Sequence, residues 1–381
     1  MKRRILTQDH EHFFATVKSF FESEAVPNLE AWESAGLVDR DFYRKAGALG
    51  LLGFQVPEEY GGAGLDTYTY NVVVSEAAAS VHFAPTGLRL HTDVVLPYFL
   101  KFTDDDQKAR WLPDLASGDL MAAIAMSEPG SGSDLAGIST KARRDGDSYV
   151  ISGAKTFITS GLNADLVIVV ARTDVSSNRR DGLTLLVVED GMKGFSRGRK
   201  LNKLGLKYSD TAELFFDDVH VPVANRLGDE GQAFRYLASN LPQERLSISV
   251  GAVAMATTAL NDTIEYARNR KIFEQPLSSF QNTKFVLAEV ATEIEAAQQF
   301  LDRAVEELDD GELSPADAAK VKLFCTEMQA RAVDRCLQVY GGYGYVHDYP
   351  IATMYADARV TRIYGGSSEV MKVIIAKSLG I

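Results

Sequence analysis

The chain has 381 residues, of which 46% are hydrophobic and 24% charged, as expected for a globular protein of two or three domains. The net charge of −12 argues against nucleic acid or an anionic membrane as the main partner, but it leaves anionic small ligands open. No apolar stretch approaches the ~20 residues of a membrane-spanning helix, so we expect no membrane span.

The cysteine and histidine pattern points to a reducing compartment and to no metal site. Cys325 and Cys336 lie in a segment of helical pattern, roughly 16 Å apart at 1.5 Å per residue, which is too far for a disulfide. With no recognisable secretory signal or transit peptide, we expect a cytoplasmic protein of bacterial type. The six histidines show no metal-ligand spacing, so no metal is expected.

The first part of the chain has helical periodicity. Apolar residues recur at positions i, i+3, i+4 and i+7 over residues 9–24, and similar patterns cover 39–52 and 67–81. Another amphipathic stretch follows Asp104. These patterns predict an N-terminal helical domain over residues 1–118.

The texture then changes to short β-type runs separated by clusters of Gly, Asn and Asp. The runs cover residues 149–152, 156–159, 166–170, 183–188 and 213–216. Residues 176–181 have the composition of an exposed hairpin loop. We therefore predict a central, antiparallel, barrel-like β domain over residues 119–229.

Helical periodicity returns for the rest of the chain. Ser314 is a candidate N-cap followed by Pro315 in the first helical position. The predicted helices cover residues 231–271, 281–310, 315–340, 350–362 and 367–379. A C-terminal domain over residues 230–381 is long enough for a four-helix bundle, which makes the chain an α+β protein of three segments.

Five segments could carry chemistry, and each also has a purely structural interpretation. The Gly- and Ser-rich loop 126–134 lets a ligand approach the backbone, or it is a surface turn. Segments 338–344 and 363–369 are Gly-rich breaks between helices, and Ser367 or Ser368 is a candidate N-cap. The basic cluster 268–273 also fits a positively charged helix end. On sequence alone, segment 240–246 is a solvated helical turn.

In this order and at these spacings, the segments resemble the acyl-CoA dehydrogenase family over essentially the whole chain. The sequence Ala125-Met-Ser-Glu-Pro-Gly-Ser-Gly-Ser-Asp-Leu-Ala-Gly137 fits the family's first signature, and Gln338-Val-Tyr-Gly-Gly-Tyr-Gly-Tyr-Val-His-Asp348 fits the start of the second. Lys155–Gly161 resembles the family's flavin-facing strand. Arg270–Phe273, together with Phe280 and Gln281, resembles the segment that reaches the FAD of a neighbouring subunit.

The resemblance implies an FAD site shared between subunits of a homo-oligomer, in the family a homotetramer. The residues implied to line the flavin ring are Met126, Ser127, Gly132, Ser133, Phe157 and Thr159. The residues implied to hold the pyrophosphate and adenosine of the neighbour's FAD are Arg270, Phe273, Gln281, Gln338, Gly341 and Gly342. Ser367 and Glu369 would contact the same FAD as Ser127. Glu274 stands where relatives usually have Gly, and Thr353 where they have Lys or Arg.

The resemblance also implies a reaction, the β-oxidation-type α,β-dehydrogenation of an acyl-CoA thioester to the trans-2-enoyl-CoA. In the family a carboxylate takes the α proton, flavin N5 accepts the β hydride, and a backbone N–H, here that of Gly365, polarises the thioester carbonyl. Most relatives carry the base in a Tyr-Glu-Gly-Thr-Ser motif, but this chain has Tyr364-Gly365-Gly366-Ser367-Ser368.

The missing carboxylate identifies a particular branch of the family. In the long-chain and isovaleryl branches the base precedes an Arg in the helix after the β domain, which here is Glu244 before Arg245. This resemblance makes Glu244 the predicted base, in place of a residue on a solvated turn. Glu369 is the second candidate base. Segments 241–246 and 363–366 look closer to the long-chain branch. The implied substrate contacts are Ser133, Leu241, Arg245 and Tyr364.

The resemblance leaves the acyl group and the electron acceptor open. It implies a medium-chain, long-chain or branched acyl-CoA, and straight-chain, branched and steroid side-chain thioesters all remain possible. An electron-transfer flavoprotein is the implied acceptor. The alternatives are an oxidase or monooxygenase of the same fold that uses O2, and a non-catalytic acyl-CoA-binding member.

Overall fold

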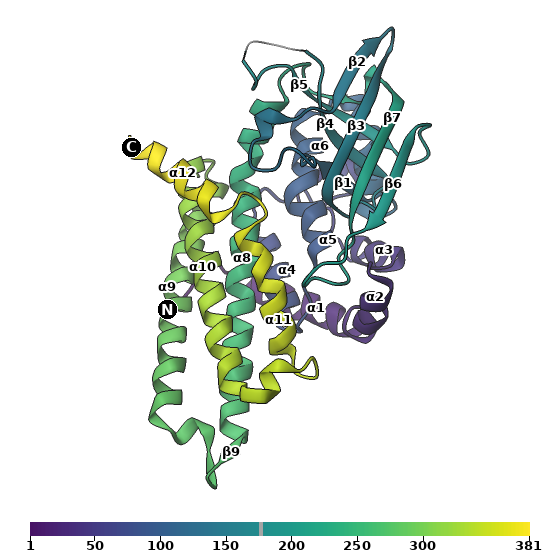
Figure 1. The fold of residues 1–381 in the computed structure, drawn as a ribbon. Helices are drawn as coiled ribbons and strands as arrows, with labels where there is room; N and C mark the ends of the chain where they lie inside the picture. The colour runs from purple at the N-terminus through teal and green to yellow at the C-terminus, as the bar shows by residue number, and fades with distance from the viewer. Residues whose placement is uncertain (175–177) are drawn as a thin grey trace.

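The fold has a helical N-terminal part, a central sheet and a set of long C-terminal helices (Figure 1). The computed structural model describes residues 1–174 and 178–381. The N-terminal helices are α1 (Gln8–Glu24), α2 (Leu29–Ala35), α3 (Arg40–Ala48), α4 (Thr69–Ala79), α5 (Thr86–Arg89), α6 (Leu96–Phe102) and α7 (Asp105–Ser117). A π-helical segment, Leu90–Val95, joins α5 to α6.

Capping and aromatic packing define the N-terminal part. Asp104 caps α7: its side chain accepts from the Gln107 N–H, while the Gln107 side chain accepts from the Asp104 N–H. Phe21, Trp32 and Phe42 lie in a core cluster with fully or almost fully buried rings. The helices predicted over 9–24, 39–52 and 67–81 are thus present as α1, α3 and α4, with shorter ends for the last two.

The central sheet is mixed rather than purely antiparallel. Its strands are β1 (Ala122–Ala125), β2 (Lys141–Asp145), β3 (Ser148–Thr159), β4 (Leu166–Arg172), β5 (Leu183–Glu189), β6 (Phe195–Lys200), β7 (Thr211–Pro222) and β8 (Arg226–Leu227). The order is β6-β7-β3-β2-β4-β5-β8, with β1 also beside β4. Most pairs are antiparallel as predicted, but β1 and β2 run parallel to β4. Parallel neighbours need a crossover connection, and in both parallel pairs at least one other strand lies between the partners along the chain.

Two of the predicted β runs belong to one strand. Residues 149–152 and 156–159 both lie in β3, where the prediction separated them. The register of β3 against β7 shifts between Ile151 and Gly153 and again between Lys155 and Ile158, so the strand continues through two irregularities. The hairpin loop predicted at 176–181 begins in residues 175–177, which lie outside the described residues.

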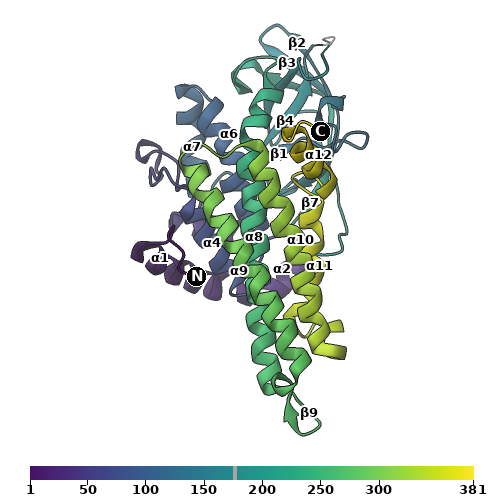
Figure 2. The ribbon, with the colours of Figure 1, turned by 90° about the vertical axis from the view of Figure 1, so that its left-hand side faces the viewer.

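The C-terminal part is built on three long helices that lie side by side (Figure 2). Its elements are α8 (Ala233–Asn269), β9 (Lys271–Ile272), β10 (Gln275–Pro276), α9 (Gln281–Asp309), α10 (Pro315–Tyr340), α11 (Pro350–Ala358) and α12 (Ser368–Ser378). Helix α10 packs against α8, α9, α11 and α12. Ser314 caps α10 as predicted. The helix predicted over 350–362 is α only to Ala358 and then continues as a 3₁₀ turn.

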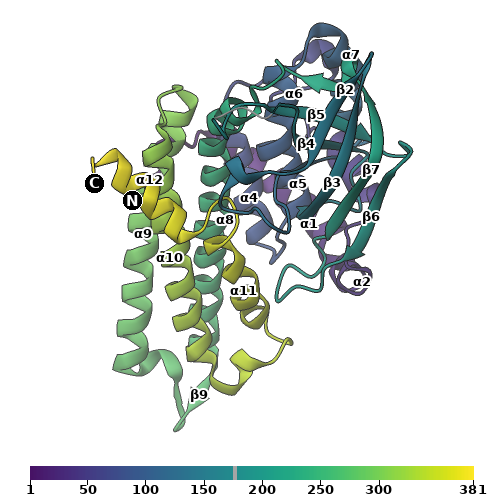
Figure 3. The same ribbon diagram turned by 45° about the horizontal axis from the view of Figure 1, so that its top comes forward.

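The sheet lies beside one end of the long helices, and the β9–β10 hairpin extends from the opposite end (Figure 3). Cys325 and Cys336 are both free and buried in α10. Within the described ranges, no helix has the length and hydrophobicity needed to cross a membrane. The same residues contain no cluster of His, Cys, Asp and Glu suited to a metal ion.

Candidate active site

A cavity of about 480 Å³ lies where the loop after β1, the end of β3, helix α8 and the segment after α11 meet. Residues more than 200 positions apart in the sequence, such as Met126 and Tyr364, therefore line the same cavity. The predicted site residues that line it are Met126, Ser127, Gly132, Ser133, Phe157, Thr159, Leu241, Glu244, Arg245, Tyr364 and Gly365. The structure thus brings together the predicted flavin-ring, substrate and catalytic residues.

Glu244 is a buried carboxylate on this wall. Its side chain belongs to α8, its exposed fraction is 6%, and Oε1 accepts a hydrogen bond of 3.0 Å from the Tyr98 hydroxyl. Burial raises the pKa of Glu244 to about 7, although the Tyr98 hydrogen bond and the Arg245 charge both act in the opposite direction. The solvated interpretation is therefore wrong, because residues 242–250 are buried on every side of the helix.

The neighbouring Arg245 is also buried. Its exposed fraction is 5%, and its Nε has no hydrogen-bond partner among the residues that the structure describes. Burial lowers the pKa of the guanidinium, and the Glu244 charge partly offsets this.

The turn at Gly365 presents a free donor to the same cavity. Gly365 and Gly366 have φ of 62° and 96°, a conformation that glycine adopts most easily. Over residues 1–174 and 178–381, no group accepts a hydrogen bond from the Gly365 N–H. The Lys322 ammonium donates to the Gly366 carbonyl at 2.7 Å and so ties the turn to α10. A Cβ at Gly365 would lie 2.3 Å from Ile248 Cδ1.

Phe157 forms an exposed aromatic rim. Its side chain is 70% exposed and its φ is 58°, an unusual value for a non-glycine residue, at the second irregularity of β3. The Thr156 N–H donates to the Ser127 carbonyl at 3.0 Å, which joins the strand to the loop after β1. Strained backbone of this kind persists where surrounding contacts hold it, and it is common at binding sites.

A buried ion pair holds the loop after β1 against β3. The Lys155 ammonium lies 2.9 Å from Glu128 Oε1 and donates to the Met126 carbonyl at 3.1 Å. Burial lowers the pKa of Lys155 to about 8 despite the Glu128 charge. Burial alone would raise the pKa of Glu128, but hydrogen bonds from Thr140 and Ser139 and the Lys155 charge hold it at about 2.

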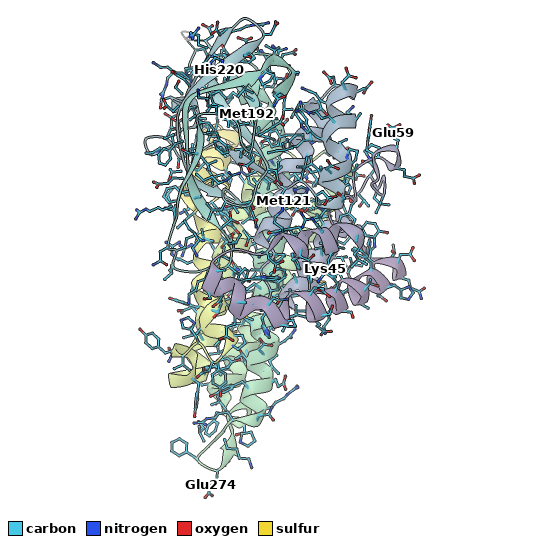
Figure 4. The ribbon with its side chains drawn as sticks, turned by 90° about the vertical axis from the view of Figure 1, so that its right-hand side faces the viewer. Lys45, Glu59, Met121, Met192, His220 and Glu274 are labelled. Atoms are coloured by element: carbon cyan, nitrogen blue, oxygen red, sulfur yellow. The ribbon has the colours of Figure 1, made fainter. Side chains whose placement is uncertain are left out.

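A second group of predicted cofactor residues lies far from the cavity. Arg270 directly follows the C-terminal end of α8, roughly 40 Å from Glu244 at 1.5 Å per residue. Phe273 is 87% exposed on the β9–β10 hairpin, and Glu274 marks the tip of the molecule (Figure 4). The other exposed members of this group are Gln281, Gln338, Gly341 and Gly342.

We call these exposed residues the distal group. One contact and one backbone angle describe its local structure. The Arg270 guanidinium lies over the Tyr343 ring at 5.2 Å, which links the hairpin to the turn after α10. Glu274 has φ of 63°, a left-handed conformation that glycine adopts more easily than other residues. The residue that departs from the family's usual Gly thus lies at a position of this hairpin that favours glycine.

Ser367 and Glu369 lie at the start of α12, beside the cavity rather than in its wall. The Ser367 hydroxyl accepts from the Val370 N–H, which makes Ser367 the N-cap. Glu369 is exposed, and hydrogen bonds from its own N–H and from the Ser367 hydroxyl lower its pKa. These properties make Glu369 poorly suited to act as the base.

Several residues that shape the site are not recognisable from the sequence. Tyr98, Glu128, Lys155 and Lys322 carry the hydrogen bonds described above. A lysine within a β-type run, or on the apolar face of a helix, indicates a buried side chain with a polar partner, because a buried lysine needs one. The partner itself is not readable from the sequence. For Tyr98 no pattern separates its role from ordinary packing.

Comparison with known proteins agrees with this geometry. The models of the acyl-CoA dehydrogenase N-terminal, middle and C-terminal domains match residues 7–119, 123–219 and 231–380. The chain belongs to the acyl-CoA dehydrogenase family. It is therefore an oxidoreductase with the acyl-CoA dehydrogenase fold, as the sequence predicted.

Relatives cover nearly the whole chain. The mitochondrial long-chain specific acyl-CoA dehydrogenase of Sus scrofa is 42% identical over 99% of this chain and 88% of its own length. An acyl-CoA dehydrogenase of Bacillus subtilis is 37% identical over 98% of both chains. The crystal structure of acyl-CoA dehydrogenase from Geobacillus kaustophilus superposes with a TM-score of 0.98 at 43% identity and covers both chains fully. The long-chain relative agrees with the branch that the sequence predicted.

Proposed function

We propose that this acyl-CoA dehydrogenase uses FAD to convert an acyl-CoA thioester to the trans-2-enoyl-CoA, with Glu244 as the base. The observation that carries the proposal is the buried Glu244 carboxylate, whose pKa of about 7 suits proton abstraction near neutral pH. It shares a cavity with the free Gly365 N–H and the exposed Phe157 ring.

The residues of the loop after β1 and of β3 fit FAD. Phe157 offers an exposed ring to a flat ligand, and a Cβ built on Gly132 would meet open space. Met126, Ser127, Gly132, Ser133, Phe157 and Thr159 would hold the ring, with Ser367 and Glu369 contacting the cofactor from α12. Bound FAD would supply the acceptor for the hydride that leaves the β carbon.

The chain's own groups would handle the proton and the carbonyl. Glu244, shielded from water, takes the α proton in its carboxylate form. The Gly365 N–H donates to the thioester oxygen and stabilises the charge that develops there as the proton leaves. Tyr364, Leu241 and Arg245 line the path of the acyl group, and Ser133 contacts the substrate from the loop after β1.

The distal group supports a homo-oligomer, and we propose the family's homotetramer. Arg270, Phe273, Gln281, Gln338, Gly341 and Gly342 are exposed on a face that the cavity of the same chain cannot reach. They would hold the pyrophosphate and adenosine of the partner subunit's FAD, and Arg270 would provide the cation that a pyrophosphate requires. An exposed Phe273 is also typical of an interaction surface.

The proposal also names a class of acyl group and an electron acceptor. The name of the long-chain relative from Sus scrofa and the base on α8 favour a medium-chain, long-chain or branched acyl-CoA. We propose an electron-transfer flavoprotein as the acceptor. An oxidase of this fold would instead pass the electrons to O2.

The test is anaerobic mixing of the FAD-loaded protein with a panel of acyl-CoA thioesters while the flavin absorbance is followed. We expect the wild type to bleach and Glu244→Gln to bleach at least about 100-fold more slowly, because general base catalysis contributes that much. Glu265→Gln, an exposed glutamate on the same helix, is the matched control and should bleach like the wild type.

Two outcomes would contradict the proposal. Bleaching of Glu244→Gln at the wild-type rate rejects Glu244 as the base, and a colourless wild type that binds no FAD rejects the dehydrogenase. Admitting O2 to the substrate-reduced wild type completes the test. Slow reoxidation by O2, and fast reoxidation by an electron-transfer flavoprotein, are expected of a dehydrogenase.

A further inference from the structure

A second cavity, of about 250 Å³, adjoins the candidate active site. The residues that line both cavities, and so form a shared wall, are Ala84, Arg89, Gly251, Met255 and Asp357. Met255 lies on α8 roughly 16 Å beyond Glu244, at 1.5 Å per residue. A chain that runs from the proposed base along α8 therefore comes to the shared wall, and the second cavity lies directly behind it.

One face of α8 extends from the proposed base to the second cavity. The residues of this face that line the first cavity are Glu244, Ile248, Gly251 and Met255, at helix positions i, i+4, i+7 and i+11. The last two also line the second cavity. Beyond Glu244 the face carries only apolar residues, as a hydrocarbon chain that begins at the thioester requires.

The inner part of the second cavity is apolar. Phe83, Tyr208 and Met354 line it and are at most 6% exposed, and the Tyr208 hydroxyl already accepts a hydrogen bond of 2.7 Å from the Ala84 N–H. The exposed residues of the lining are His82, His347, Asp348 and Pro350. Protein interiors rarely contain voids larger than a water molecule, so an apolar cavity of this size beside the proposed substrate site indicates room for a ligand.

The two charged residues of the shared wall are held by the chain itself. The Arg89 guanidinium donates to the Ser247 carbonyl and, at 2.9 Å, to the Ser247 hydroxyl. The Asp357 carboxylate accepts from the Leu206 N–H at 2.5 Å. These hydrogen bonds engage the charged ends within the protein, and the aliphatic stem of an arginine can line an apolar path.

The other residues of the shared wall leave room for a chain. Ala84 and Gly251 are small, and a Cβ on Gly251 would lie 2.3 Å from an Arg89 guanidinium nitrogen, so a larger residue there would crowd the wall. Met255 is half-buried, and its sulfur accepts from Gln329 at 3.1 Å. The unbranched methionine side chain adapts readily to its surroundings, so Met255 is the residue that can move aside for a ligand.

We propose that the second cavity binds the distal end of the acyl chain, so that the preferred substrate is a long-chain acyl-CoA. Gly251 and Met255 are thereby specificity-determining residues, because they lie where the chain passes from the first cavity to the second. The inference rests on the proposed dehydrogenase function, since it assigns the far end of the same substrate.

The test uses the FAD-loaded protein and a series of saturated straight-chain acyl-CoA thioesters, from short to very long. The rate of anaerobic bleaching at low substrate gives kcat/KM for each, and calorimetry gives the Kd of each matching enoyl-CoA. We expect the affinity to rise by up to about fourfold for each methylene that becomes buried. The rise should continue from medium to long chains, which occupy the second cavity.

Two variants test the assignment of the second cavity. Gly251→Leu places a side chain in the shared wall, and Ala79→Leu reduces the second cavity from α4 without touching the first. We expect the ratio of long-chain to medium-chain kcat/KM, and the matching ratio of affinities, to fall at least about tenfold in both. Ala31→Leu, at an exposed alanine on α2, is the matched control and should keep the wild-type ratios.

The possible failures are distinguishable. If the wild type bleaches with medium chains but both kcat/KM and affinity fall for long ones, the inference is wrong and the dehydrogenase function stands. Ratios that stay unchanged in Ala79→Leu also overturn the inference, and this variant keeps the test decisive if Gly251→Leu does not fold. If no thioester bleaches the wild type, the proposed function itself fails.

Discussion

Replacing Glu244 with Gln keeps the shape of the side chain but removes its ionisation, and the structure predicts an effect on stability as well as on rate. Burial raises the pKa of Glu244 from its ordinary 4.5 to about 7. At about 1.4 kcal/mol for each tenfold change in proton affinity, the difference corresponds to about 3 kcal/mol. This is the free energy that the folded protein loses when the buried carboxylate must be ionised.

The sign of the effect follows from which state holds the proton more tightly. The folded chain binds it more tightly than the unfolded chain, so the contribution of Glu244 to stability is fully present below about pH 4.5. It falls as the pH rises through about 7. Glu244→Gln does not ionise at any of these pH values. We therefore expect its free energy of unfolding to improve relative to the wild type by up to about 3 kcal/mol between about pH 5 and about pH 8.

The assay compares denaturant unfolding of the two FAD-loaded proteins at these two pH values, with Glu265→Gln as the control on the same helix. The difference between variants is measured at each pH, so that other titrating groups cancel. If the relative stability of Glu244→Gln does not change with pH, the raised pKa is wrong. If it changes as expected while bleaching proceeds at the wild-type rate, the carboxylate is buried but is not the base.

The remaining predictions concern the groups that support the base and the cofactor loop. Because the Tyr98 hydrogen bond lowers the pKa of Glu244, Tyr98→Phe should move the acidic limb of the kcat/KM profile to higher pH by about one pH unit; an unmoved limb contradicts that coupling. Lys322→Met removes the donor to the Gly366 carbonyl and should slow bleaching about tenfold while bound flavin is retained. Loss of flavin at an unchanged rate constant would argue against this role. Lys155→Met leaves its partner carboxylate buried and should destabilise the protein by about 3 kcal/mol, measured by denaturant unfolding.

Periodicity and composition predicted most of the fold because each element has a clear local signal. The amphipathic helices and the N-cap of α10 follow from residues close together in sequence. The parallel pairing of β1 with β4 and the continuation of β3 through residues 153–157 depend on distant strands, which no local pattern encodes. The domain boundaries at 118/119 and 229/230 stay a prediction.

The candidate site was less accessible to local reasoning than the fold. Glu244 was identified through its place in a family pattern, whereas its neighbours alone suggested a solvated turn. The reason is that α8 is covered on all sides between residues 242 and 250, although the sequence there is rich in polar residues, among them Gln243, Glu244 and Arg245. Polar residues of this kind ordinarily indicate a helix face in contact with solvent.

The proposed position of the base on α8 would separate two tasks that a single turn would otherwise perform. A glutamate at position 365 would have to combine a φ of 62° with a Cβ 2.3 Å from Ile248 Cδ1. In the proposed mechanism the N–H of the same residue also faces the thioester. With glycine there, Lys322 can hold the turn through the Gly366 carbonyl, and the Gly365 N–H stays free. The carboxylate is instead supported by a long helix and by Tyr98, whose hydrogen bond tunes its pKa without touching the turn. The two groups can therefore be altered independently, and substitutions at Tyr98 should shift the pH profile whereas substitutions at Lys322 should change the rate.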